Sequence, residues 1–188
     1  MNIHNMNNIG DLEISLLGFL IEKPMHGYEL HRRVSDLKGF GIVWHLKIGK
    51  LYAMLSKLNR NEFVVAKNHQ EGNRPVRKEY MITLKGETLF IDWLQKPVLH
   101  GRDFRHYFLL KLFFALKKGS ENALTLIDVQ KNECEQWKSH FDLKFSNTIN
   151  DSQTPFSYRE LVDHYRLMQI RADLEWLDWS AKKIREEK

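Results

Sequence analysis

The spacing of apolar residues over the first sixty positions predicts three helices separated by short breaks. The first begins near Asp11, a residue that often caps helices, and runs through LEISLLGFLIE. Pro24 and Gly27 then interrupt the helical pattern. The second helix covers YELHRRVSDL, residues 28–37, and KGFGIVW forms the next linker. The positions expected to face the core are Leu12, Leu16, Leu17, Leu20, Leu30, Val34 and Leu37.

The third predicted helix, within LKIGKLYAMLSKLNRNEF at residues 46–63, has two different faces. One face is apolar and consists of Ile48, Leu51, Leu55 and Leu58. The opposite face is small and basic and consists of Lys47, Lys50, Ala53, Met54 and Lys57. Such a helix is either an ordinary surface helix or one that lies against an acidic partner.

After Asn61 the pattern changes from helical to alternating. FVVAKNH (63–69) and VRKEYMIT (76–83) predict two strands, joined by the turn QEGNRP. A further helix over LKGETLFIDWLQKP stops at Pro97. Three helices followed by a basic hairpin is the order of a winged helix-turn-helix, in which the third helix enters the major groove.

The remaining residues predict helices only. FRHYFLLKLFFALKK (104–118) is apolar nearly all round and should be buried, and the next helix carries apolar positions from Ala123 to Phe141. After the polar loop SNTINDSQTP comes a last helix. The predicted fold is therefore mainly α with a small β-hairpin wing. It comprises a winged helix-turn-helix domain at residues 1–96 and an all-helical dimerisation and effector-binding domain at residues 97–188.

Two apolar stripes follow the last helix. The first has heptad spacing and is predicted to form the dimer contact: Leu167, Ile170, Leu174, Leu177, Ala181 and Ile184. The second consists of Leu161, Tyr165, Met168, Ala172, Trp176 and Trp179. Either one stripe faces the chain's own domain and the other a second subunit, or both form one broad core-facing surface in a monomer.

Positive charge is concentrated in one segment of the chain. The whole sequence has a net charge of +5, whereas residues 40–85 hold nine Lys and Arg against three Glu. Residues 97–188 are nearly balanced, with fifteen basic and fourteen acidic residues. A concentrated basic segment fits a polyanion partner, and the alternative is a solvated lysine-rich surface. Joined to the predicted wing, it favours DNA.

The residues expected to bind DNA lie on the third helix and in the hairpin. Small residues such as Gly49 let the helix approach the groove, and Tyr52 either packs or donates to a phosphate. The full set of candidates is Lys47, Gly49, Lys50, Tyr52, Lys57, Asn73, Arg74, Arg77 and Lys78.

Other classes of function find little support in the residues. No nucleophile, phosphate-loop or zinc-protease motif occurs, so we expect no enzyme, no cofactor and no metal site. The single cysteine, Cys134, excludes an intrachain disulfide, and no apolar run is long enough to span a membrane. We therefore expect a cytoplasmic protein.

Lys111 is unusual because it lies amid apolar residues of the central helix. It pairs with a protein acid, extends to an edge, or faces a polar cavity for a carboxylate-bearing aromatic ligand. On the third reading, the ligand contacts are Phe104, Tyr107, Phe108 and Lys111.

Several short motifs, in this order, resemble PadR-type transcriptional regulators. They are LLGFLIEKPMHGYEL (16–30), GKLYAMLSKL (49–58) and RKEYMITLKG (77–86), followed by FLLKLFFA (108–115) and LEWLDW (174–179). The resemblance implies a homodimeric winged-helix repressor that binds an inverted-repeat operator in double-stranded DNA and is released by a small aromatic effector such as a phenolic acid. By position, Gly49, Lys50 and Tyr52 would contact DNA. Position 50 is commonly a small hydroxyl residue in the family, so the lysine here prevents transfer of an operator preference.

The sequence thus predicts a dimeric DNA-binding repressor. The alternative, from a different class, is a dimeric aromatic-ligand or multidrug-binding protein with only non-specific affinity for DNA. Its support is the aromatic content of the C-terminal half, and salt dependence of DNA binding separates the two readings.

Overall fold

The computed structural model describes residues 9–69, 77–148 and 157–186. These residues form two compact units. Unit 1 contains the residues up to 95 together with residues 109–114, and unit 2 contains residues 96–108 together with the residues from 115 on.

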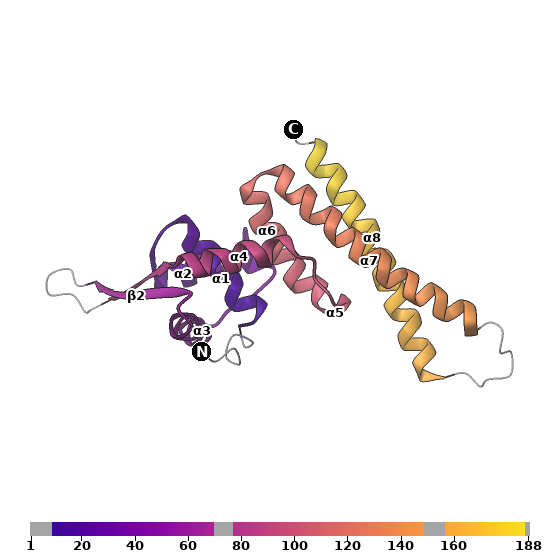
Figure 1. The fold of residues 1–188 in the computed structure, drawn as a ribbon, viewed down its shortest axis with the longest axis horizontal. Helices are drawn as coiled ribbons and strands as arrows, with labels where there is room; N and C mark the ends of the chain where they lie inside the picture. Colours follow the sequence, from indigo (N-terminus) through magenta and orange to yellow (C-terminus); the bar gives the residue numbers. More distant parts are fainter. Residues whose placement is uncertain (1–8, 70–76, 149–156, 187–188) are drawn as a thin grey trace. The chain divides into compact units, whose positions relative to one another are not determined.

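Unit 1 is a winged helix-turn-helix, as the sequence predicted. Its elements are α1 (Asp11–Glu22), β1 (Met25–His26), α2 (Gly27–Val34), the 3₁₀ turn η2 (Phe40–Ile42), α3 (Ile48–Arg60), β2 (Val64–His69), β3 (Arg77–Ile82) and α4 (Leu84–Gln95) (Figure 1). The antiparallel sheet has the order β1-β3-β2. Strand β1 was not predicted, because two residues are too few to show alternation.

The ends of the first two helices differ from the sequence prediction. Gly10 rather than Asp11 is the N-cap of α1, and the Asp11 carboxylate accepts a hydrogen bond of 2.6 Å from the Trp93 indole. Helix α2 ends at Val34, so Leu37 is 74% exposed instead of facing the core. The chain turns here because the Asp36 carbonyl accepts the backbone N–H groups of two glycines in the linker.

An aromatic cluster forms the centre of unit 1. Phe19, Phe40, Phe90, Phe113 and Phe114 meet mostly edge to face, with ring centroids 5.1–6.1 Å apart. Residues 109–114 supply two of these rings, which explains the near-continuous apolar character of their sequence. The cluster closes against α1 at Gly18, where a Cβ atom would lie 2.5 Å from the Phe114 ring.

Unit 2 is all helical. It begins with α5 (Gly101–Asp103) and the π-helical turn η3 (Phe104–Phe108), which run on into α6 (Leu109–Lys118). Residues 109–114 of α6 belong to unit 1, and the rest of α6 belongs to unit 2. Two long helices follow, α7 (Ser120–Thr148) and α8 (Tyr158–Glu186), which lie side by side in an antiparallel pair (Figure 1). On α7, Gln130 is fully buried, and its amide bonds both the N–H and the carbonyl of Val98.

The heptad stripe of α8 is used inside the chain. Leu167, Ile170, Leu174, Leu177 and Ala181 are at most 8% exposed, on the face that packs against α7. The chain's own α7 thus covers these five residues, which corrects their assignment to the dimer contact. Ile184, the sixth residue of that assignment, is half-buried, and its contact with a second subunit stays a prediction. The second stripe lies on the opposite side of the helix. There, Leu161, Tyr165, Met168 and Trp179 are 53–65% exposed.

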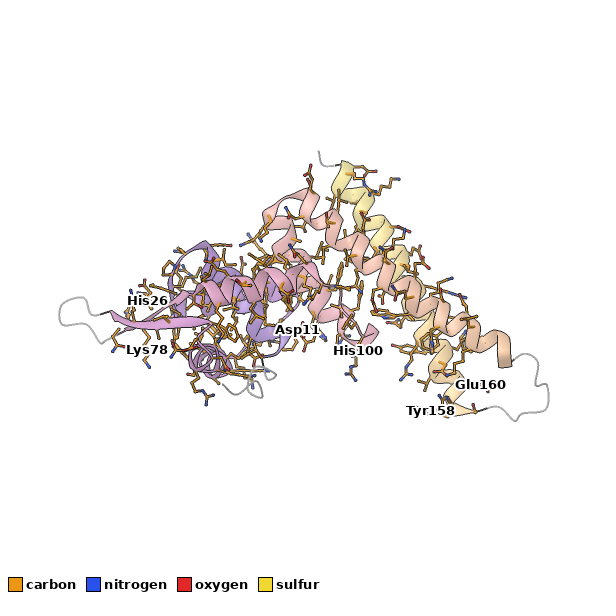
Figure 2. All side chains as sticks on the ribbon, in the orientation of Figure 1. Asp11, His26, Lys78, His100, Tyr158 and Glu160 are labelled. Atoms are coloured by element: carbon orange, nitrogen blue, oxygen red, sulfur yellow. The ribbon has the colours of Figure 1, made fainter. Side chains whose placement is uncertain are left out.

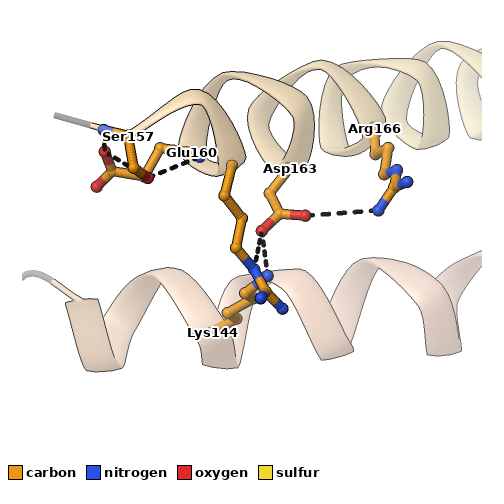
Figure 3. Close-up of polar contacts among 6 residues, drawn as sticks. Lys144, Ser157, Glu160, Asp163 and Arg166 are labelled. Atoms are coloured by element: carbon orange, nitrogen blue, oxygen red, sulfur yellow. Dashed lines mark hydrogen bonds and ion pairs between the residues drawn. The ribbon is translucent and has the colours of Figure 1, made fainter.

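Polar contacts hold the start of α8. The buried Asp163 carboxylate bonds the Lys144 ammonium of α7 and lies 3.6 Å from an Arg166 nitrogen (Figure 3). The hydrogen bond from Lys144 and the surrounding cations lower the pKa of Asp163. One turn earlier, Ser157 and Glu160 bond each other's backbone N–H groups, at 2.9 and 3.3 Å, and so close the amino end of the helix.

Candidate nucleic-acid interface

The exposed amino end of α3 carries the central residues of the predicted DNA surface. Leu46 is buried and anchors the chain, Lys47 is the N-cap in extended conformation, and the helix begins at Ile48. Lys47, Gly49 and Lys50 are all exposed. No side chain caps the first turn, so its backbone N–H groups add partial positive charge to that of the lysines.

The surface around Gly49 is open. A Cβ atom added at this glycine would have no atom of the protein within 4 Å. The neighbouring Lys50 ammonium lies 5.6 Å from the centre of the Trp44 ring, a cation–π contact that holds the lysine beside the open surface. Sequence reasoning assigned Trp44 only to a linker and missed this role. A basic helix end with open space at Gly49 can be approached closely by another molecule.

Three residues of α3 lie differently from the helical-wheel prediction. Lys57 was placed on the free basic face, but its ammonium bonds Glu13 of α1 at 2.7 Å. Met54 was placed on the same face and is only 5% exposed, whereas Ile48, expected in the core, is 43% exposed. The buried face of α3 consists of Leu51, Met54, Leu55 and Leu58, so it includes Met54 and leaves Ile48 in the first turn outside.

The Tyr52 side chain packs against the start of α2 and is also partly exposed to solvent. Its ring lies against the backbone of Gly27 at the start of α2, where a Cβ atom would be 2.4 Å from the ring. The side chain is still 40% exposed. Both readings of Tyr52 from the sequence therefore remain compatible with its position.

In the wing, Arg77 and Lys78 begin strand β3 and are exposed. The Lys78 carbonyl oxygen lies 3.3 Å from His26 Nδ1, which ties the start of β3 to β1. Figure 2 shows the two residues at the same end of the sheet. Asn73 and Arg74, also predicted to bind DNA, lie outside the described residues. The described part of the wing thus adds two cations to those of α3.

The four residues proposed for an aromatic ligand belong to different surroundings. Lys111 is 2% exposed, and its ammonium donates to the Trp93 carbonyl at 2.7 Å and lies 4.9 Å from the centre of the Trp93 ring. In unit 2, Phe104 and Phe108 stack at 4.8 Å, and each meets Trp176 edge to face. Tyr107 is half-buried. The Lys111 ammonium is thus engaged in the core of unit 1, and its contact with a ligand stays a prediction.

The described residues contain neither a metal site nor a membrane-spanning helix. Within residues 9–69, 77–148 and 157–186, no cluster of three His, Cys, Asp or Glu side chains has the geometry to hold a metal ion. None of the helices in these segments has the length and apolar character needed to cross a membrane.

Comparison with protein families matches both parts of the chain. Residues 16–91 match the transcriptional regulator PadR-like family, and residues 104–185 match the virulence activator alpha C-terminal family. Among proteins of known role, the chain is 25% identical over 126 residues to the negative transcriptional regulator PadR of Bacillus subtilis. That match covers 66% of this chain and 68% of the relative.

Solved structures give matches over most of the chain. Bacillus subtilis PadR in complex with operator DNA is 22% identical, with 90% of this chain and 97% of that one covered and a TM-score of 0.45. Its complex with p-coumaric acid is 21% identical, with 95% and 98% covered and a TM-score of 0.40. The PadR-like regulator BC1756 of Bacillus cereus is 19% identical, with 94% and 99% covered and a TM-score of 0.38. The two family matches and the winged-helix fold together show that this chain belongs to the PadR-like family of transcriptional regulators.

Proposed function

We propose that this regulator is a repressor that binds an inverted-repeat operator as a homodimer, with α3 of each subunit in the major groove. The observation that carries the proposal is the open, basic amino end of α3, where Lys47 and Lys50 flank a glycine with free space above it. Repression is supported by the name of the B. subtilis relative, a negative transcriptional regulator. Because the partner is chromosomal DNA, we place the protein in the cytoplasm.

In this arrangement different residues contact the bases and the phosphates of the DNA. Lys50 extends from the first turn of α3, the part of a recognition helix that meets base edges, and a lysine donates well to guanine. Lys47 is the N-cap and approaches a phosphate together with the amino end of the helix. Arg77 and Lys78 contact the backbone from the wing. Lys57 contributes little, since Glu13 offsets its charge.

The exposed stripe of α8 is our proposed dimer contact. Its large side chains recur along most of a 29-residue helix, and a second copy would cover an apolar surface that is otherwise in water. On this view residues 1–96 bind DNA and residues 97–188 join the subunits. We expect Met168→Glu to give folded monomers in sedimentation velocity, because Met168 is 57% exposed. Leu174→Glu, at a buried position of the same helix, should instead lower the stability of the fold.

The proposed effector is a small aromatic compound that binds the helical part of the chain. Support comes from the sequence resemblance and from the stacked rings of Phe104 and Phe108. Release of DNA requires only that the compound bind the DNA-free state better than the DNA-bound one. Titration of a panel of phenolic acids against a preformed DNA complex tests this part, and no release by any of them would refute it for that class.

The experiment that tests DNA recognition is selection of bound duplexes from a random pool at physiological salt. We expect enrichment of an inverted repeat. On that repeat, Lys50→Ala should lower affinity by about 10- to 100-fold if the lysine reads a base pair. If Lys50 contacts only phosphate, all sequences should weaken alike and the salt dependence should fall by about one charge. A pool without enrichment would refute sequence-specific repression and favour a ligand-binding protein with non-specific DNA affinity.

A further inference from the structure

The amino end of α2 lies close to α3, with Gly27 buried and the next residue, Tyr28, exposed. Helix α2 begins at Gly27 directly after strand β1, and its N-cap residue, His26, makes no side-chain bond to the first turn. The first N–H groups of a helix have no partner within it and carry partial positive charge. Glu29 in the same turn is bonded to Lys23 at 2.6 Å, which offsets the charge of this carboxylate.

Tyr52 of α3 lies over this helix end. A Cβ atom on Gly27 would be 2.4 Å from the Tyr52 ring and 3.0 Å from its hydroxyl oxygen. Only glycine at position 27 therefore admits the ring in this place. As a result, the Tyr52 hydroxyl is held beside the amino end of α2, in a side chain that is 40% exposed.

Tyr80 approaches the same place from the sheet. It lies on β3 opposite Met25, two residues before α2 begins, and it is only 5% exposed. Its hydroxyl has no hydrogen-bond partner among the residues that the structure describes. Burial raises the pKa of Tyr80, and the nearby Tyr52 hydroxyl raises it further, so the two phenols lie within electrostatic reach of each other. Although the Tyr80 side chain is buried as a whole, its hydroxyl oxygen is not among the fully buried unpaired atoms of the described residues, so an acceptor from outside can reach it.

We propose that the hydroxyls of Tyr52 and Tyr80 and the amino end of α2 together bind one phosphate of the DNA backbone. Neither hydroxyl has an acceptor among the described residues, and the first N–H groups of a helix have none within the helix. A phosphate offers several acceptor oxygens at one point. This inference rests on the proposed DNA-binding function and extends the contact surface from α3 to α2 and β3. The proposal also explains why residue 27 is a glycine, since any side chain there would displace Tyr52 from the phosphate site.

The test uses Tyr52→Phe and Tyr80→Phe in the full-length chain, which remove one oxygen each and keep the ring. Binding to a fluorescent duplex should weaken about 10- to 100-fold in each variant, the effect of losing a hydrogen bond to a charged acceptor. The loss should be equal on specific and random duplexes, and the salt dependence should not change, because the hydroxyls are uncharged. Tyr158→Phe, at an exposed tyrosine of α8, is the matched control and should bind as the wild type does.

Duplexes with a single methylphosphonate locate the contact. Neutralising the proposed phosphate should weaken the wild-type protein but have a much smaller effect on Tyr80→Phe, while other positions affect both equally. Wild-type affinity of Tyr80→Phe in a correctly folded protein, or equal sensitivity at every position, would overturn the inference and leave the proposed function intact. If the wild-type protein shows no sequence preference, the proposed function fails, yet the phosphate contact can still be scored on random duplex. A wild-type protein that binds no duplex overturns both.

Discussion

Replacement of Asp173 by asparagine should stabilise this protein at neutral pH. Asp173 lies on α8 beside the buried face that packs against α7, and it is half-buried. Within the described residues, no cation or hydrogen-bond donor pairs with its carboxylate. Burial therefore raises the pKa of Asp173 from 3.8 to about 6. The charged form, which dominates at pH 7, is thus disfavoured in the folded state.

The size of the effect follows from this pKa difference. Each pKa unit corresponds to about 1.4 kcal/mol, so a rise of about two units gives an upper value of about 3 kcal/mol. Because the carboxylate keeps some contact with water, we expect Asp173→Asn to raise the free energy of unfolding by about 1–2 kcal/mol at pH 7.5.

The gain should depend on pH in a defined direction. The folded state binds the Asp173 proton more tightly than the unfolded chain does, so this group stabilises the fold most below pH 3.8 and loses that contribution as the pH rises to about 6. The difference between variant and wild type should therefore be full at pH 7.5, reduced at pH 5 and small at pH 4.

Urea unfolding followed by circular dichroism at these three pH values measures the difference. Glu175→Gln is the matched control, since Glu175 is an exposed carboxylate on the same helix and its loss should change stability by less than about 0.5 kcal/mol. A variant no more stable than wild type at pH 7.5, or a difference that stays constant with pH, would refute the reasoning.

Three further predictions concern packing, charge and reactivity. Gly86→Ala should destabilise the fold by about 2 kcal/mol or more in thermal unfolding, because the new Cβ would lie 2.2 Å from the Phe63 carbonyl oxygen. Gly49→Ala is the control for folding: its new Cβ would have no atom within 4 Å, so the variant should fold normally and weaken only DNA binding. Asp163→Asn should lower the free energy of unfolding by about 1–3 kcal/mol at pH 7. The loss should be smaller in acid, because the pKa of Asp163 is lowered in the fold and the stability that its carboxylate contributes disappears as the pH falls. Equal losses at neutral and acidic pH would contradict this. Burial raises the pKa of the Cys134 thiol to about 12, so iodoacetamide at pH 8 should label it only in urea, and labelling of the folded protein would show that α7 opens.

The local pattern of the sequence determined the elements of the fold. Helix α1 spans Asp11–Glu22, and β2 and β3 form the basic hairpin, as the sequence predicted. Such elements can be read from a single sequence because helical and alternating periods, proline and glycine act over a few residues. The winged-helix order followed from these elements, and with it the expectation that the first turn of α3 faces DNA.

The tertiary structure decided which neighbour each face meets. Both sides of α8 are apolar, and the sequence cannot tell which side α7 covers, so the heptad stripe was assigned to a partner although it is buried within the chain. In the same way, Lys57 bonds Glu13, and Tyr80 lies beside Tyr52, across separations of 44 and 28 residues. A period of apolar residues marks a face of a helix but not what lies against it, because that depends on how segments distant in sequence pack together.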